Sequence, residues 1–349
     1  MKQPDTLLEI EDLHTGFELD DGTVRAVDGV DLTISRGEVL AVVGESGCGK
    51  SVMARSVLRL VDKPGRITGG HIRVHGDDGV VDMVTAPGPD LRAVRGRKVA
   101  MVFQEPIASM SPMHTLGNQI GEALILHGEA TKAEARTRVV ELLRRVGIAA
   151  PERRVDEYPF QMSGGMLQRA MIAMALSCGP DLLIADEPTT ALDVTTQAQI
   201  LDLLRELRRD TDMAIMLITH DLGVAAQLAD RIAVMYLGSV VESGTTDTVL
   251  GSPRHPYTRA LLRSVPKLGS RSRERLRPVR GMVPGPYARP PGCPFHPRCD
   301  EFMAGRCDAT VPRAVPAPLP DGAKGTDGTV SCLLYGADSV PPQKGEPAA

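Results

Sequence analysis

The sequence lacks any apolar run long enough to span a lipid bilayer, which takes roughly 20 residues. Its first residues, MKQPDTLLEIEDL, place acidic side chains where a secretory signal peptide needs an apolar core. The formal net charge is only −4, so the composition predicts no broad attraction to nucleic acid or to anionic lipid. We therefore expect a cytosolic protein that binds no nucleic acid and reaches a membrane only through a partner.

Cysteine is scarce, and proline is unevenly distributed. Six cysteines in a cytosolic chain argue against a disulfide framework. Of the 27 prolines, 16 fall in residues 256–349, after a region in which strand-like and helical patterns alternate. These patterns predict a compact α/β domain over residues 1–255, a loop-rich extension over 256–340 and a disordered tail over 341–349.

Short continuous apolar runs in the first part indicate strands that are buried on both faces. They are VLAVV at 39–43, LLIAD at 182–186 and AIMLIT at 214–219. Because amphipathic helical patterns lie between them, we expect a parallel sheet covered by helices. Glycine-containing turns at 66–85 indicate an antiparallel β subdomain, and the absence of strand patterns at about 105–180 indicates a helical insertion.

The segment GESGCGKS has the spacing of a P-loop, Gly-x4-Gly-Lys-Ser, between a predicted strand and a predicted helix. In such a loop the lysine, Lys50, reaches the β- and γ-phosphates, and the hydroxyl of Ser51 binds Mg²⁺. The alternative is a glycine-rich turn with a solvated lysine. The remaining residues predicted to surround the phosphates are Gly44, Glu45, Ser46, Gly47, Cys48 and Gly49.

Two carboxylates follow the apolar run LLIAD, in the segment ADEP. Asp186 ends the strand beside the P-loop, where it can hold Mg²⁺, and Glu187 can polarise the attacking water as a general base. Such a pair is also typical of a solvated turn, but the P-loop favours the catalytic interpretation.

Gln104 in MVFQEP and His220 in LITHD also follow strand-like runs. The amide of Gln104 could contact both Mg²⁺ and water, and the imidazole of His220 could donate to a γ-phosphate. Either residue could instead be purely structural. Ligands of open α/β sheets lie at the carboxyl ends of the strands, so we count Lys50, Gln104, Glu187 and His220 as catalytic candidates.

In order and spacing, the P-loop, Gln104, MSGGM, LLIADEPTTALD and His220 resemble the motifs of ATP-binding cassette (ABC) ATPases over about residues 6–255. The resemblance implies an ABC-type P-loop NTPase fold, ATP with Mg²⁺, and two cassettes packed head to tail. It implies further site residues, among which Phe17 stacks on adenine and Asp193 lies at the dimer seam. The alternative for Phe17 is an ordinary core phenylalanine. Those expected to contact the ATP of the other cassette are Ser163, Gly164 and Gly165. Met166 departs from the glutamine that many members carry.

A narrower resemblance rests on VFQEPIASMSPMHTLGNQI, SPRHPYTRALLRSVP and GCPFHPRC, which are similar to segments of the ATPase subunits of oligopeptide/dipeptide importers. It implies a bacterial importer in which this chain lies at the cytoplasmic face of the membrane. Its partners would be a second ATPase, either a copy or a paralogue, two permease subunits and an extracytoplasmic binding protein. A nickel or other small-solute importer, or a non-transport ABC ATPase, is the alternative.

Four cysteines lie in the proline-rich extension, with 5, 7 and 24 residues between neighbours. They are Cys293, Cys299, Cys307 and Cys332. Four thiols in a segment with little core of its own suggest a stabilising metal centre. No pair has the close spacing of a zinc knuckle, whereas a [4Fe–4S] cluster tolerates varied spacing. Zinc and free thiols remain alternatives, and the resemblance to peptide-importer ATPases favours the [4Fe–4S] cluster.

Overall fold

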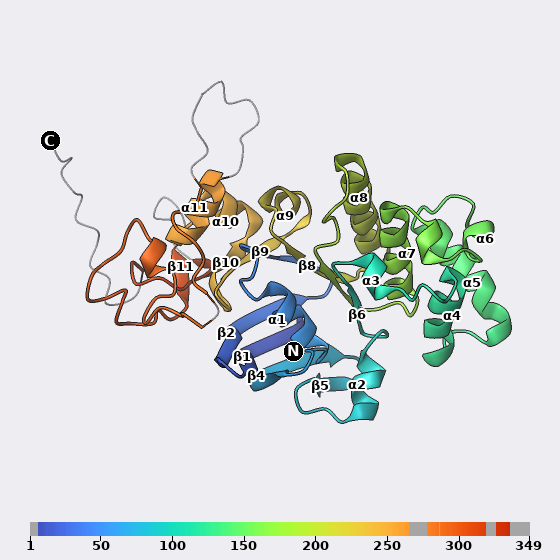
Figure 1. Cartoon of the computed structure of the whole chain (residues 1–349), viewed down its shortest axis with the longest axis horizontal. Coiled ribbons are helices and arrows are strands. Elements are labelled where there is room, and N and C mark those ends of the chain that lie inside the picture. Colours follow the sequence, from blue (N-terminus) through green and yellow to red (C-terminus); the bar gives the residue numbers. More distant parts are fainter. Residues whose placement is uncertain (1–5, 265–277, 286, 319–325, 336–349) are drawn as a thin grey trace, which may run out of the picture.

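The computed structural model describes residues 6–264, 278–285, 287–318 and 326–335 (Figure 1). The tail predicted at 341–349 lies outside these residues. Two sheets organise this described part of the chain, one of eight strands and one of four. Within the described residues, no helix is both long and apolar enough to cross a membrane.

The eight-stranded sheet carries the predicted buried strands at its centre. Its order is β11 (Val315–Pro318), β12 (Thr326–Val330), β10 (Ser239–Thr245), β9 (Arg231–Tyr236), β3 (Val39–Val43), β8 (Ala214–Thr219), β7 (Leu182–Asp186) and β6 (Val99–Val102). Strands β9, β3, β8, β7 and β6 are parallel, as the apolar runs predict. The edge formed by β10, β12 and β11 is antiparallel, which the sequence did not predict.

The four-stranded sheet is antiparallel and packs against the main sheet (Figure 1). Its order is β2 (Gly22–Ser35), β1 (Thr6–Leu19), β4 (Gly65–Gly76) and β5 (Gly79–Asp82). The shared core takes Leu40 and Val42 from β3 and Ile10 and Ile34 from the smaller sheet. Side chains alternate along a strand, so Ala41 and Val43 face the opposite side of β3.

Helices surround both faces of the main sheet and form a subdomain of their own between β6 and β7 (Figure 1). That subdomain contains α3 (Pro106–Ser109), α4 (Leu116–Leu126), α5 (Lys132–Arg145), α6 (Pro151–Arg154), the 3₁₀ turn η1 (Pro159–Gln161) and α7 (Gly164–Leu176). The other helices before the extension are α1 (Lys50–Val57), α2 (Gly88–Val94), α8 (Val194–Thr211), α9 (Leu222–Leu228) and α10 (Thr246–Gly251). These elements give the predicted ABC-type fold.

The C-terminal extension begins with α11 (Pro256–Ser264), and its described residues are otherwise loop-rich apart from the turn η2 (His296–Arg298) and strands β11 and β12. Strand β12 pairs with β10 of the main sheet. Gly328 has φ +85, and a Cβ there would come within 1.8 Å of the carbonyl oxygen of Ser243, so only glycine permits this pairing. Phe295 also shares a core with Val43, which means that the extension is packed into the α/β unit.

Candidate active site

The P-loop joins β3 to α1, and its conformation requires glycine at both ends. A Cβ at Gly44 would lie 2.3 Å from the carbonyl oxygen of Met235, and one at Gly49 would lie 2.1 Å from that of Ala26. Both glycines have positive φ, at +155 and +99. The loop is therefore held tightly against β9 and β2, as a preformed cradle should be.

Lys50 begins α1 and folds back over this loop. Its ammonium donates to the carbonyl oxygens of Gly44, at 2.8 Å, and of Glu45, at 3.0 Å. The residue is only 4% exposed. Its charge therefore lies inside the curve of the loop, where it can meet phosphate oxygens.

The hydroxyl of Ser51 and the carboxylate of Asp186 form the second feature of the site. Ser51 Oγ donates to Asp186 Oδ1 at 2.9 Å. Burial raises the pKa of Asp186, and the hydrogen bond from Ser51 offsets part of that shift. Two oxygen ligands side by side next to the P-loop suit Mg²⁺, which bridges protein oxygens and nucleotide phosphates.

Glu187 lies at the centre of a group of hydrogen-bonding side chains. Gln104 Nε2 and Thr190 Oγ1 donate to its Oε2 at 3.1 and 2.8 Å, and His220 Nδ1 lies 3.2 Å from its Oε1. Burial acts to raise the pKa of Glu187, but the hydrogen bonds from Thr190 and His220 outweigh it and lower the pKa. An ionised, oriented carboxylate of this kind can act as a general base towards water.

Two cavities meet at the P-loop. One, of about 550 Å³, is lined by Ser46, Gln104, Glu187 and His220 among others. The other, of about 720 Å³, shares Ser46 with the first and continues past Gly47 towards β2 and the turn after β9. The first contains Glu187, the candidate base, so it suits the terminal phosphate. The second then suits the nucleoside end of the same molecule.

Comparison with known proteins agrees with this arrangement. The family described as ABC transporter matches residues 27–190, and the oligopeptide/dipeptide transporter C-terminal region matches residues 241–307. A putative peptide import ATP-binding protein of Brucella ovis is 49% identical over 318 residues, covering 89% of this chain and 93% of that protein. The dipeptide transport ATP-binding protein of Bacillus subtilis is 47% identical over 307 residues, covering 88% of this chain and 90% of that protein.

The chain belongs to the ABC transporter ATP-binding proteins. A solved dimeric ATP-binding cassette in a post-hydrolysis state, bound to ADP and phosphate, is 28% identical with a TM-score of 0.61, covering 69% of this chain and 99% of that one. The resemblance found in the sequence is thereby confirmed, and the activity of the site is ATP hydrolysis coupled to transport. The residues that we assign to it are still predictions of role.

The ABC signature residues lie away from the two cavities. Ser163 caps α7, and its hydroxyl accepts from the backbone N–H of Met166 at 3.4 Å. Neither Ser163 nor Gly164 lines the cavity that holds Glu187, and both are exposed. Asp193 caps α8, where it accepts from the backbone N–H of Thr196 at 2.9 Å. These residues are thus free to meet a second cassette.

The predicted adenine-stacking residue, Phe17, is placed differently from the other predicted residues. Its ring lies against Gly65, where an added Cβ would come within 2.5 Å of the ring. Phe17 lines neither cavity, whereas its cross-strand neighbour Val24 lines the one beyond the P-loop. Stacking of Phe17 on adenine therefore stays a prediction without support from these contacts.

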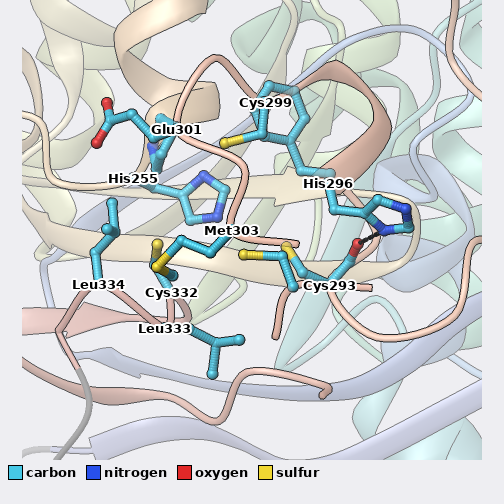
Figure 2. Close-up of a pocket in the computed structure, with 12 residues that line it drawn as sticks. His255, Cys293, His296, Cys299, Glu301, Met303, Cys332, Leu333 and Leu334 are labelled. Atoms are coloured by element: carbon cyan, nitrogen blue, oxygen red, sulfur yellow. Dashed lines mark hydrogen bonds between the residues drawn. The ribbon is translucent and has the colours of Figure 1, made fainter. Parts of the chain in front are cut away.

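The four cysteines of the extension surround one small cavity, which Figure 2 shows together with His255. All four are free thiols, and burial raises the pKa of Cys293, Cys299 and Cys332 to about 11. Among the described residues, however, no group of three or more His, Cys, Asp or Glu side chains could hold a metal ion as arranged. His296 bonds back to the loop through Nδ1, 3.0 Å from the carbonyl oxygen of Cys293.

Sequence reasoning missed two contacts of the site. Thr190 reaches Glu187 because the two residues lie three apart in a turn, with the Thr190 N–H bonded to the Glu187 carbonyl at 3.1 Å. The spacing in DEPTT was visible in the sequence and could have indicated it. Arg298, which contacts Glu45 from the extension, carried no local signal because the two residues are 253 apart.

Proposed function

We propose that this chain is the ATP-hydrolysing subunit of a peptide importer. The observation that carries the proposal is the match of residues 241–307 to the oligopeptide/dipeptide transporter C-terminal region, beyond the cassette itself. Relatives that are 49% and 47% identical over most of the chain are named for peptide import and dipeptide transport. The cargo is therefore proposed to be di- or oligopeptides.

In the proposed cycle, two cassettes close head to tail on ATP. Lys50 and the P-loop amides hold the phosphates, while Ser51 and Asp186 would hold Mg²⁺, which neutralises phosphate charge when bound. Glu187 accepts a proton from the attacking water, and His220 steadies the γ-phosphate end. The exposed N-terminus of α7, at Ser163, would complete the site of the other cassette because a helix N-terminus favours anions.

The helical subdomain offers a surface for the membrane partner. Four large apolar side chains there are strongly exposed: Ile107 and Leu126 at 75%, Met113 at 78% and Phe160 at 71%. Apolar side chains that gather on one part of a surface mark sites of protein–protein contact. We assign this region to contact with a permease subunit, of which the assembly has two, and this contact places the chain at the cytoplasmic face of the membrane. A second ATPase, copy or paralogue, and an extracytoplasmic peptide-binding protein complete the assembly.

The four thiols of the extension are proposed to hold a [4Fe–4S] cluster. Zinc–sulfur bonds of about 2.3 Å would bring four sulfurs within roughly 4 Å of one another. In a [4Fe–4S] cluster each thiolate binds its own iron, which suits four thiols placed around a common space. The observation behind the proposal is that all four cysteines line one cavity. Its role would be to fasten the loops of the extension together.

Transport is tested by reconstituting the chain with its permeases, partner ATPase and binding protein in proteoliposomes. ATP should drive accumulation of a labelled dipeptide, and an assembly whose ATPases carry Glu187→Gln should accumulate none. ATP-dependent uptake of nickel without uptake of any peptide would overturn the proposed cargo.

The cluster is tested by anaerobic purification followed by an absorption spectrum and iron and sulfide analysis. We expect about four iron and four sulfide per chain, lost in Cys299→Ser and retained in Cys178→Ser, whose thiol lies outside the cavity. A colourless protein, or one holding about one zinc per chain, would contradict the assignment.

A further inference from the structure

A buried arginine of the extension contacts the P-loop directly. Arg298 donates from Nη1 to Glu45 Oε2 at 2.7 Å and from Nη2 to Glu45 Oε1 at 3.0 Å. The side chain of Arg298 is 4% exposed and that of Glu45 is 26% exposed. Paired donors on both carboxylate oxygens are the strong, geometrically specific form of this contact.

The extension fixes this guanidinium from several sides. Arg298 Nε donates to the carbonyl oxygen of Arg280 at 2.8 Å, and Nη2 donates to that of Gly281 at 3.3 Å. The guanidinium lies 5.7 Å from the centre of the Tyr236 ring. A side chain with this many contacts has lost its rotational freedom, so it holds its partner in one place.

The partner, Glu45, is also held through its backbone. Its N–H donates to Tyr257 Oη at 2.9 Å, and its carbonyl accepts from Lys50 Nζ at 3.0 Å. Tyr257 belongs to α11 and Arg298 to η2, so two parts of the extension hold the same P-loop residue. The position of Glu45 thus depends on residues that lie beyond the α/β domain in sequence.

Glu45 presents an electrostatic problem for a phosphate-binding loop. It lines the cavity that contains Glu187 and His220, where the terminal phosphate of ATP is expected. An unpaired carboxylate there would repel the phosphates, and the low dielectric of a partly buried site would strengthen the repulsion. The bidentate contact cancels that charge and turns the carboxylate towards the extension.

We propose that Arg298 is a positioning residue for ATP binding, which neutralises Glu45 and makes the C-terminal extension part of this chain's own ATP site. The inference rests on ATP binding alone and not on the cargo or the cluster.

The test measures the affinity of the full chain for ATP by titration calorimetry in Mg²⁺-free buffer, where no hydrolysis occurs. Arg298→Ala should weaken binding at least about tenfold, equivalent to about 1.4 kcal/mol. Glu45→Gln serves as the reference for the double variant, because it has no carboxylate that needs neutralising. The double variant, Arg298→Ala with Glu45→Gln, should return to within about threefold of Glu45→Gln, because the charge needing neutralisation has been removed. The defect of Arg298→Ala should also shrink as salt rises.

Arg259→Ala is the matched control. Arg259 also belongs to the extension and forms an ion pair with Glu301 at 2.8 Å, and Glu301 is not a P-loop residue, so loss of this pair should leave the affinity unchanged. Wild-type affinity in Arg298→Ala would overturn the proposal. So would a double variant as weak as Arg298→Ala, or a loss of equal size in Arg259→Ala, since either result would show general loosening of the extension.

Discussion

Ser51 and Asp186 are joined by a 2.9 Å hydrogen bond across 135 residues of sequence. This bond ties the first turn of α1 to the end of β7 and places a hydroxyl and a carboxylate side by side. The burial that raises the pKa of Asp186 also makes its charge costly, and a bound cation would offset that cost. The site is therefore preorganised for Mg²⁺, for which Ser51 and Asp186 would supply oxygen ligands.

Glu187→Gln should separate nucleotide binding from hydrolysis. The amide has the same shape but cannot accept a proton from water, so kcat should fall by about 10²- to 10⁴-fold. ATP binding should persist, since Lys50 and the P-loop are unchanged, and the undissociated dimer should accumulate on ATP. Steady-state ATPase assays and size-exclusion chromatography check both. A rate above about a tenth of the wild type would exclude Glu187 as the base.

Lys50→Ala should impair nucleotide binding, in contrast to Glu187→Gln, which should impair hydrolysis. It removes the buried ammonium that now donates to Gly44 and Glu45. We expect it to weaken ATP binding itself, with no ATP-trapped dimer on size-exclusion chromatography.

Thr190→Val should change the pH dependence of hydrolysis. The substitution keeps the shape of Thr190 and removes its 2.8 Å hydrogen bond to Glu187, one of the contacts that lower the pKa of that carboxylate. The pKa of Glu187 should therefore rise. Because the base must be deprotonated, activity should be lost at a higher pH than in the wild type as the solution is acidified.

At neutral pH the rate of Thr190→Val should fall only about fivefold, since one hydrogen bond contributes about 1 kcal/mol. A profile of kcat against pH measures both effects. Thr190→Ser retains the hydroxyl and should restore the wild-type profile. If the acid limb of this profile lay at the same pH in Thr190→Val as in the wild type, Thr190 would not be lowering the pKa of Glu187.

The parts of the site that could be predicted are those written in short segments. The P-loop needs glycines at fixed spacing, because Gly44 and Gly49 meet backbone atoms of other strands. Asp186 and His220 could be placed because each follows an apolar run, and the carboxyl ends of parallel strands share one edge of a sheet. His220 and Glu187, the residue after Asp186, accordingly line one cavity.

The extension was harder to predict, because its contacts are long-range. Val315–Pro318 reads as a proline-rich loop, yet it forms a strand at the sheet edge, where proline is tolerated because no ladder donor is needed on the outer side. The contact between Arg298 and Glu45 depends on tertiary packing that no local pattern records. Phe17 illustrates the opposite case. The family motif predicts that its ring stacks on adenine, but the contacts of the ring do not support that role.

Ser163→Arg tests whether the signature helix serves the other cassette. A bulky cation at the cap of α7 should block the helix N-terminus from approaching phosphate, while the variant's own P-loop still binds ATP. We suggest a tandem fusion of one copy with Ser163→Arg and one with Lys50→Ala. In a head-to-tail dimer one intact composite site survives, so the fusion should hydrolyse ATP. If each cassette used its own signature, no site would be intact and the fusion would be inactive.

Gly165→Ala and Gly164→Ala should separate a structural glycine from one that faces a partner. A Cβ at Gly165 would come within 2.6 Å of Thr196 Cγ2, whereas nothing lies within 4 Å of one at Gly164. Thr196 cannot easily turn away because its hydroxyl donates to Asp193 Oδ2 at 2.7 Å. Gly165→Ala should therefore lower the free energy of unfolding by about 1–3 kcal/mol.

Adding Thr196→Ser to Gly165→Ala removes the clashing methyl group, keeps the hydroxyl that bonds Asp193, and should restore the urea midpoint. Gly164→Ala should leave that midpoint unchanged but reduce the ATPase rate, because a methyl group beside the cap of α7 obstructs the phosphate of the other cassette. Equal stability of Gly165→Ala and the wild type, or failure of Thr196→Ser to restore it, would disprove the steric account. Full ATPase activity in Gly164→Ala would instead show that this face of the helix meets no phosphate.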